Sequence, residues 1–258
     1  MPYVDSNGVR IHYEVDGQGP PLVMVHGWNF SIADFYEYGW VQELRDSYEL
    51  ILIDPRGHGY SDKPHEVADY APKLRAQDIL AVMDALAISK ACYLGVSMGG
   101  FTGFALLRYA PERIQAFLVG ASHPYPWKNE GDSILYTKLR GGMKAYLEWD
   151  IPNSPGLTVT DWFMCRRLAN DPEALAACFR SFGSSFEDVI PNNTIPCLFF
   201  AGSLDGSLPH IQRCVEEMPN SQLLVIPNRA HGELFRFTEP LSHIKKFLAE
   251  VHVGIQSQ

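Results

Sequence analysis

The sequence lacks the features that mark several large classes of protein. Its five cysteines are odd in number and scattered without a Cys-x-x-Cys pair, so we predict neither a disulfide framework nor a zinc site. No run approaches the roughly 20 apolar residues that a membrane-spanning helix needs. The N-terminus also lacks a basic stretch leading into an apolar run, which a secretory signal would have. We therefore expect a cytoplasmic protein with no membrane partner.

Positive charge is also scarce. The 258 residues include 21 Lys and Arg against 30 Asp and Glu, which gives a net charge of −9 and an isoelectric point near 5.4. The average field of such a chain repels the phosphates of nucleic acids, so we expect no nucleic-acid partner. No metal-ligand cluster, phosphate-binding glycine loop or dinucleotide fingerprint is present, so we also expect no metal and no cofactor. No pattern in the sequence predicts an oligomeric state.

Short apolar runs alternate with helical patterns along most of the chain. Asn7-Gly8 predicts a tight turn between two N-terminal strands, Tyr3–Ser6 and Val9–Asp16. Further apolar strands are predicted at Leu22–Val25, Tyr48–Ile53, Ala91–Val96, Gln115–Val119, Cys197–Ala201 and Leu223–Ile226. A helix is predicted between Ile32 and Asp46, and helical patterns separate later strands. Apolar strands separated by helices indicate an α/β fold, in which a mostly parallel sheet is covered by helices on both faces.

This alternation breaks at about Ser122. From there to residue 190 prolines are frequent, and helical patches are rich in aromatic residues. The aromatic residues of this stretch include Tyr125, Trp127, Tyr136, Tyr146, Trp149, Trp162 and Phe163. We interpret residues 122–190 as a helical cap, inserted into a core that consists of residues 1–121 and 191–258.

The strongest chemical signal is Gly95-Val96-Ser97-Met98-Gly99, which stands where an apolar strand gives way to a helix. A residue at such a turn has a strained backbone, and the flanking glycines leave out side chains that would collide with the neighbouring strand and helix. The turn exposes the serine hydroxyl at the carboxyl end of the sheet, where open α/β sheets bind ligands. The alternative is a glycine-rich turn whose serine only caps a helix. The strand before and the helix after favour Ser97 as a nucleophile.

A serine hydroxyl becomes a good nucleophile only when a base removes its proton. His231 follows the last apolar strand and precedes the final helix, so it can extend back over the sheet toward Ser97. His26 and His58 each adjoin a glycine after a strand, and we expect them to organise loops. Four other histidines are expected to be solvated on edges or surface helices: His12, His65, His243 and His252.

The base in turn needs a carboxylate that fixes its tautomer and stabilises its charged form. Asp205 follows the strand Cys197–Ala201, which places it on the same edge of the sheet as Ser97 and His231. Asp54 also ends a strand, but it leads into Pro55-Arg56-Gly57-His58-Gly59, and we expect it to hold that turn by hydrogen bonds. We therefore predict Asp205 as the partner of His231.

Acyl transfer also needs N–H groups that stabilise the developing oxyanion. The backbone N–H of Met98 directly follows the nucleophile, and that of Trp28 lies in the loop after Leu22–Val25. We predict that these two amides form the oxyanion hole, and that the Trp28 side chain contributes to the substrate pocket. Trp149, Trp162 and Phe163 of the cap are our other candidates for its walls, although each could instead belong to the cap's own core.

Taken together, these motifs resemble the α/β-hydrolase superfamily, and within it the serine esterase, lactonase and cofactor-free haloperoxidase-like branch. The resemblance covers nearly the whole chain. It rests on His26-Gly27-Trp28, Asp54-Pro55-Arg56-Gly57-His58-Gly59, Gly95-Val96-Ser97-Met98-Gly99-Gly100, Gly202-Ser203-Leu204-Asp205 and Ala230-His231. It implies an eight-stranded sheet and a serine hydrolase that cleaves a small, largely apolar ester or lactone. One departure is Arg229-Ala230 before the histidine, where the family often has a glycine.

Two other functions fit the same sequence. Carbon–carbon bond hydrolases resemble this chain and also use serine, and Arg166 and Arg167 of the cap could hold the carboxylate of a keto-acid substrate as arginines do in such enzymes. An adjacent arginine pair is otherwise typical of a solvated helix face. The second alternative is a non-catalytic ligand-binding member of the fold, which can retain all three residues.

Overall fold

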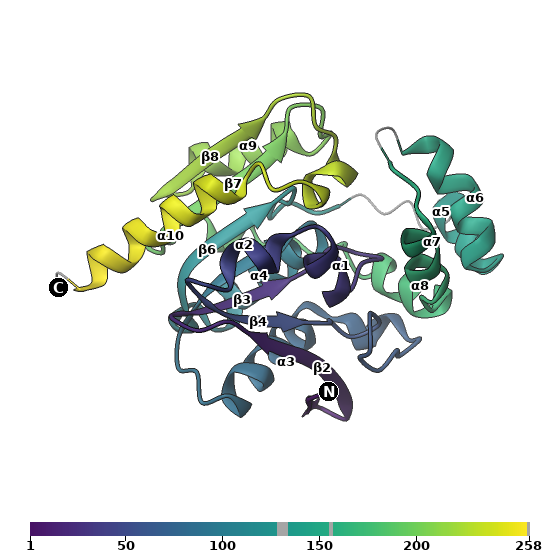
Figure 1. The fold of residues 1–258 in the computed structure, drawn as a ribbon, viewed down its shortest axis with the longest axis horizontal. Helices are drawn as coiled ribbons and strands as arrows, with labels where there is room; N and C mark the ends of the chain where they lie inside the picture. Colours follow the sequence, from purple (N-terminus) through teal and green to yellow (C-terminus); the bar gives the residue numbers. More distant parts are fainter. Residues whose placement is uncertain (128–133, 155–156, 257–258) are drawn as a thin grey trace.

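One eight-stranded sheet organises the computed structural model, which describes residues 1–127, 134–154 and 157–256 (Figure 1). Its strands run in the order β1-β2-β4-β3-β5-β6-β7-β8. Their bounds are β1 Tyr3–Ser6, β2 Val9–Asp16, β3 Pro21–Val25, β4 Glu49–Ile53, β5 Ala91–Val96, β6 Ile114–Gly120, β7 Cys197–Gly202 and β8 Ser221–Ile226. β1 and β2 pair antiparallel, β2 pairs antiparallel with β4, and all later pairs are parallel. The predicted α/β fold with a mostly parallel sheet is confirmed.

The N-terminal hairpin has the expected turn. Asn7 and Gly8 have φ angles of 54° and 80°, the left-handed region that a two-residue hairpin loop requires and that these residue types tolerate. A further left-handed residue explains why one predicted helix is two helices in the structure. Gly39, at φ 79°, separates α1 (Ile32–Glu37) from α2 (Trp40–Leu44), where the sequence predicts one helix.

Helices cover both faces of the sheet, because successive strand residues point to opposite sides. On one face Val23 packs in a cluster with residues of α3 (Pro72–Ala85), α4 (Met98–Tyr109) and α9 (Leu208–Glu217). On the other face Leu22 and Met24 pack in a cluster with residues of α1, α2 and α10 (Leu241–Gln256). Strands buried on both sides explain the nearly continuous apolar runs in the sequence.

Helices α5 to α8 lie together at one side of the sheet, on the right in Figure 1. Their bounds are α5 Ile134–Arg140, α6 Met143–Asn153, α7 Asp161–Leu168 and α8 Pro172–Arg180. They have an apolar cluster of their own that includes Leu139, Leu147 and Leu175. Residues 128–133 and 155–156 of the predicted cap lie outside the described residues. The division into a cap of residues 122–190 and a core of residues 1–121 and 191–258 stays a prediction.

The turn between β5 and α4 is packed against the end of β3. Ser97 lies in this turn with φ 53° and ψ −111°, a strained conformation for a residue with a side chain. A Cβ atom on Gly99 would lie 2.1 Å from the carbonyl oxygen of Val25, and one on Gly95 would lie 2.4 Å from the backbone of Gly99. The glycines therefore permit the close approach that the motif predicts.

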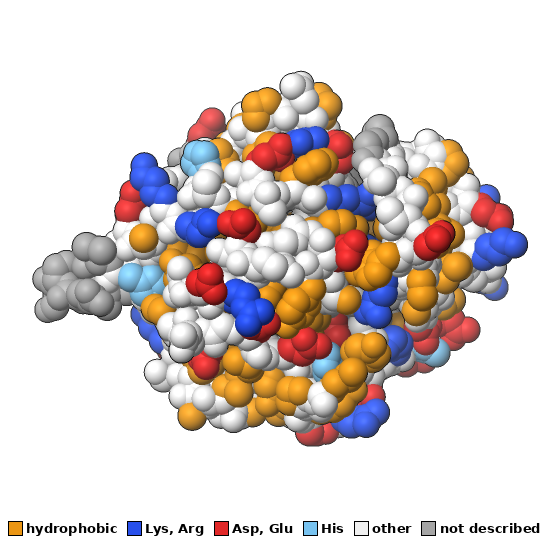
Figure 2. Space-filling model, in the orientation of Figure 1, with side chains coloured by type: hydrophobic (Ala, Val, Ile, Leu, Met, Phe, Trp, Pro, Cys, Tyr) orange, Lys and Arg blue, Asp and Glu red, His pale blue; other side chains and the backbone are white. Residues whose placement is uncertain are grey.

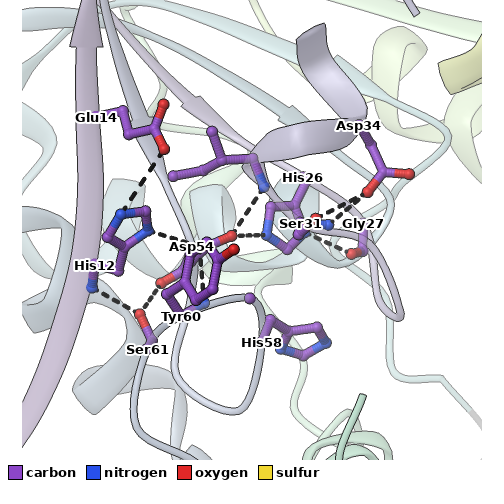
Figure 3. Close-up of polar contacts among 12 residues, drawn as sticks. His12, Glu14, His26, Gly27, Ser31, Asp34, Asp54, His58, Tyr60 and Ser61 are labelled. Atoms are coloured by element: carbon purple, nitrogen blue, oxygen red, sulfur yellow. Dashed lines mark hydrogen bonds and ion pairs between the residues drawn. The ribbon is translucent and has the colours of Figure 1, made fainter. Parts of the chain in front are cut away.

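A buried carboxylate joins the loops after β3 and β4 (Figure 3). Asp54 contacts His12 Nδ1 with Oδ2 at 2.8 Å and His26 Nε2 with Oδ1 at 3.2 Å. It also accepts hydrogen bonds from the amides of Ile32, at 2.8 Å, and Tyr60, at 3.0 Å. Burial opposes ionisation, but these partners outweigh it and hold the pKa of Asp54 well below its ordinary range. The expectation that Asp54 holds this turn is consistent with these bonds.

The expectation for His12 is wrong. Its side chain is 0% exposed, although it lies in β2 near the edge of the sheet. The loop after β4 folds back over it, with the amide of His12 donating to Ser61 Oγ at 2.8 Å and the Tyr60 ring 5.3 Å away. His58 is likewise fully buried, and its Nε2 has no hydrogen-bond partner among the described residues.

The packing of Gly99 predicts a large effect of one methyl group. Gly99→Ala should lower the free energy of unfolding by at least about 2 kcal/mol, because the new Cβ overlaps the Val25 carbonyl and either β3 or α4 must shift. Urea unfolding measures this change. Gly183→Ala is the control, since its Cβ would meet nothing within 4 Å. Equal stability of the two variants would contradict the packing described above.

The burial of His58 predicts a loss of stability in mild acid. Burial, together with His26 and Arg75, outweighs the opposing effects of the Arg56 carbonyl and Asp54 and lowers the pKa of His58 to about 3. Between its ordinary value near 6.5 and about 3, the unfolded chain therefore binds one more proton than the folded chain. Stability due to this group is complete above pH 6.5 and declines as the pH falls toward 3.

Urea unfolding at pH 7, 6, 5 and 4 tests this linkage. His58→Gln should give a shallower decline between pH 6.5 and 4 than the wild type, whereas exposed His65→Gln should not. A His58→Gln profile parallel to that of the wild type would show that another group causes the acid sensitivity.

Candidate active site

Ser97 lies between the end of β5 and the first turn of α4, and it is the partly exposed member of an otherwise buried turn. Its Oγ lies 2.9 Å from Nε2 of His231. A hydroxyl at this distance can donate its proton to a neutral imidazole. The strained turn thus directs the serine hydroxyl to the residue that the sequence predicts as its base.

His231 begins the short helix η4 (His231–Arg236), which follows β8. Its side chain is 38% exposed, and Nδ1 lies 3.0 Å from Oδ2 of Asp205. The loop before His231 lacks the glycine that the family often has there, but hydrogen bonds hold the loop in place. The carbonyl of Arg229 accepts a hydrogen bond from the amide of Leu204 at 2.9 Å, and Glu233 accepts one from the amide of Ala230 at 2.8 Å.

Asp205 follows β7 and is 4% exposed. Its Oδ1 accepts hydrogen bonds from the amide of Ser207, at 2.8 Å, and from the Ser207 hydroxyl, at 2.7 Å. Burial alone would raise the pKa of Asp205, but the bonds from His231 and Ser207 outweigh it and hold the pKa below its ordinary value. The carboxyl group is therefore ionised at neutral pH and can stabilise a positively charged His231.

Asp54 has no comparable position. Its carboxylate is occupied by His12, His26 and two backbone amides. The structure brings Ser97, His231 and Asp205 together in one chain of hydrogen bonds, and it places Asp54 in a separate one.

The two amides predicted as oxyanion-hole donors belong to residues that line one cavity with Ser97. The amide of Met98 is the first of α4, so it has no acceptor within the helix. Trp28 follows Gly27, and its indole N–H donates to the carbonyl of Leu175 in α8 at 3.1 Å. This bond connects the loop that contains Trp28 to helix α8.

The cavity at Ser97 has a volume of about 200 Å³ and mainly apolar walls. Its aromatic residues, besides Trp28, are Phe30, Phe101, Trp127, Phe179, Phe182 and Phe235. Sequence reasoning did not select any of these six as pocket residues. Phe101 stands one helical turn after Ser97, a spacing that could have identified it. The others come from distant segments, and their convergence has no local signal.

The three cap aromatics predicted as walls do not line this cavity. Trp149 packs next to Tyr146, with ring centroids 6.2 Å apart, and Trp162 packs against Tyr38 at 6.1 Å. Phe163 is buried in the cluster formed by the cap helices. Of the predicted wall residues only Trp28 lies at the cavity of Ser97. The positions of Trp149 and Trp162 agree with the alternative, a role in the packing of these helices, whereas Phe163 also lines a second cavity next to this one.

Arg166 and Arg167 are both occupied by other side chains. Arg167 is buried and forms an ion pair with Asp34 of α1, so the expectation of a solvated helix face is wrong for this residue. Arg166 donates to Ser31 Oγ at 2.9 Å, and its guanidinium lies over the ring of Tyr60. Neither guanidinium lines the cavity of Ser97.

Three observations bear on metals, membranes and charged partners. Within residues 1–127, 134–154 and 157–256, no group of three or more His, Cys, Asp and Glu side chains is arranged to hold a metal ion. No helix in these ranges is long and apolar enough to cross a membrane. On the face shown in Figure 2, acidic and basic side chains are interspersed among hydrophobic ones.

Known proteins resemble this chain in sequence or in structure. A non-heme chloroperoxidase of Streptomyces lividans is 28% identical over 267 residues, covering 92% of this chain and 95% of the relative. A pimeloyl-[acyl-carrier protein] methyl ester esterase of Vibrio campbellii is 23% identical, covering 86% and 92%. The structure of an enol-lactonase from Burkholderia xenovorans LB400 superposes with a TM-score of 0.84 at 22% identity, covering 96% of this chain and all of the other.

The family model described as alpha/beta hydrolase fold matches residues 20–161, which is more than half of the chain. This range contains β3 to β6 and the turn that presents Ser97. The chain therefore belongs to the α/β hydrolase fold family.

Proposed function

We propose that this protein is a serine hydrolase that cleaves a small, largely apolar carboxylic ester or lactone through an acyl-enzyme intermediate. The observation that carries the proposal is the relay from Ser97 Oγ to His231 Nε2, at 2.9 Å, and from His231 Nδ1 to Asp205, at 3.0 Å. This relay opens onto the aromatic cavity. Ser97 would be the nucleophile, His231 the general base and acid, and Asp205 the residue that orients His231.

The first half-reaction forms the acyl-enzyme. His231 accepts the proton of Ser97 as Oγ attacks the carbonyl carbon, and Asp205 stabilises the imidazolium that results. The oxyanion of the tetrahedral intermediate accepts hydrogen bonds from the backbone amides of Met98 and Trp28. His231 then donates its proton to the leaving oxygen, and the bond between that oxygen and the carbonyl carbon breaks.

In the second half-reaction water takes the place of the alcohol. His231 removes a proton from the water as its oxygen attacks the acyl carbon. When the new tetrahedral intermediate collapses, His231 returns this proton to Ser97 Oγ, and the carboxylic acid is released. These steps need only the groups of this chain and water.

The walls of the cavity support an apolar acyl group. Phe101, Phe179 and Phe182 surround the space next to Ser97 and offer no charged group. Relatives whose names describe a methyl ester esterase and an enol-lactonase support an ester or lactone as the bond that is cleaved.

The two alternatives have less support. Carbon–carbon bond cleavage of a keto acid needs a cation for its carboxylate, but Arg167 is paired with Asp34, and Arg166 contacts Ser31 and Tyr60. A non-catalytic binding protein would not need the aligned relay, and turnover of a short acyl ester separates that possibility from the proposal.

An organophosphonate ester should modify Ser97 covalently, because an activated serine attacks phosphorus as it attacks a carbonyl carbon. Intact-mass measurement and peptide mapping locate the adduct, and hydrolysis of p-nitrophenyl butyrate measures turnover in parallel. Ser97→Ala should abolish both. An adduct at another residue, or an active Ser97→Ala variant, would mean that the nucleophile is wrongly assigned.

Asp205→Asn should fold normally yet reduce kcat by roughly 10⁴-fold, the loss known for the equivalent change in a serine-protease triad. Neutral asparagine favours the wrong tautomer of His231 and does not stabilise its charged form. Asp54→Asn is the matched comparison, because Asp54 also follows a strand and is buried, but its partners are structural. Asp54→Asn should lower the midpoint of urea unfolding clearly while changing kcat little. The assignment of the carboxylate is wrong if the two variants exchange these phenotypes.

A further inference from the structure

A second cavity, of about 390 Å³, lies next to the aromatic one. Both are lined by Trp28, Phe30, His231 and Gly232, so His231 stands at their boundary. The rest of the second lining mixes apolar residues, among them Leu157, Phe163 and Leu204, with polar and charged ones: Asn29, Tyr146, Asp150, Asn153, Arg167, Glu233 and Arg236. The proposed base therefore stands between an apolar space and one that also contains charged groups.

Arg236 is the unusual member of this lining. It is the last residue of η4, and Nε is buried without a hydrogen-bond partner. Among the described residues its guanidinium forms no ion pair. It lies over the face of the Phe163 ring, 5.2 Å away, and within range of the charges of Arg167, Asp34 and Asp150. A guanidinium remains charged even in such surroundings. Arg236 is half-buried, and burying even part of a guanidinium without a partner is costly, so this position suggests a partner that comes from outside the chain.

The other charged residues of the cavity have partners. Arg167 is neutralised by Asp34 at its side. Asp150 accepts a hydrogen bond from Ser154 Oγ at 3.3 Å, and Glu233 accepts one from the amide of Ala230 at 2.8 Å. Among the described residues the lining thus offers one cation without an ion pair, with two carboxylates of the chain elsewhere in its wall.

The direction of the proposed reaction decides which part of a substrate faces Arg236. The acyl carbon must reach Ser97 beside the aromatic walls, and the leaving oxygen must lie near His231, which protonates it. From His231 the alcohol part can extend into the second cavity, where charged side chains stand beside apolar ones.

We propose that the second cavity binds the alcohol part of the ester, and that Arg236 binds a carboxylate carried by that part. This inference rests on the proposed serine hydrolase function. It makes the substrate an ester with an apolar acyl group and an anionic leaving group. Arg236 then acts as a specificity-determining residue, by a charge-assisted hydrogen bond to the carboxylate.

Two esters test the proposal: 4-(butanoyloxy)benzoate, and its methyl ester, in which a neutral and slightly larger group replaces the carboxylate. Arg236→Gln should raise KM for the anionic ester about tenfold relative to KM for the neutral one, the size expected for loss of one charge-assisted hydrogen bond. Asp150→Asn should shift the same ratio in the opposite direction, because it removes a like charge from the cavity. Arg213→Gln, on an exposed face of α9, should leave the ratio as in the wild type.

The outcomes distinguish this inference from the function on which it rests. If the wild type hydrolyses neither ester, the proposed function fails. If it hydrolyses both while Arg236→Gln leaves the KM ratio unchanged, the function stands and the carboxylate subsite is overturned. An equal loss with both esters would also overturn it, since Arg236 would then support only the structure. Opposite shifts in Arg236→Gln and Asp150→Asn are the result that we expect.

Discussion

The contact of Gly99 with the carbonyl of Val25 is the constraint on which the candidate site depends. At this point the end of β3, the turn after β5 and the first turn of α4 come closer than any side chain at Gly99 would allow. The same approach forces Ser97 to a φ of 53° and turns its hydroxyl away from the packed core. It also brings Gly27 and Trp28 beside Ser97, so the proposed nucleophile and one proposed oxyanion donor are positioned by a single packing contact.

Two buried aspartates at the ends of strands illustrate how surroundings separate similar residues. Asp54 and Asp205 are both almost fully buried, and both have a pKa below the ordinary value because hydrogen-bond donors outweigh burial. The donors of Asp54 include the amides of Ile32 and Tyr60, so its charge fastens one loop to another. The donors of Asp205 include a histidine whose other nitrogen is hydrogen-bonded to Ser97, so its charge is in position to act on the proton transfer that we propose.

Helices α6 and α8 contribute to the candidate site in two different ways. Phe179 of α8 and Phe182 just after it supply apolar walls near Ser97, while Tyr146 and Asp150 of α6 face the second cavity. The bond from the Trp28 indole to Leu175 links the β3 loop to α8 at the boundary of the two spaces. His231 thus lies between the space that we propose for the acyl group and the one that we propose for the charged alcohol.

The sequence by itself determined the features that depend on neighbouring residues. The alternation of strands and helices, the Asn7-Gly8 turn and the glycines around Ser97 all act within a few positions, so their patterns predict structure directly. The meeting of Ser97, Asp205 and His231 could also be predicted, because parallel strands deliver their carboxyl ends to one edge of the sheet. Only the tertiary structure decided the burial of His12, the pairing of Arg167 with Asp34 and the choice of Phe101, Phe179 and Phe182 over Trp149 and Trp162 as cavity walls. Each of these depends on which distant segments pack against one another, and hydrophobic and electrostatic contacts between such segments leave no period or spacing in the chain.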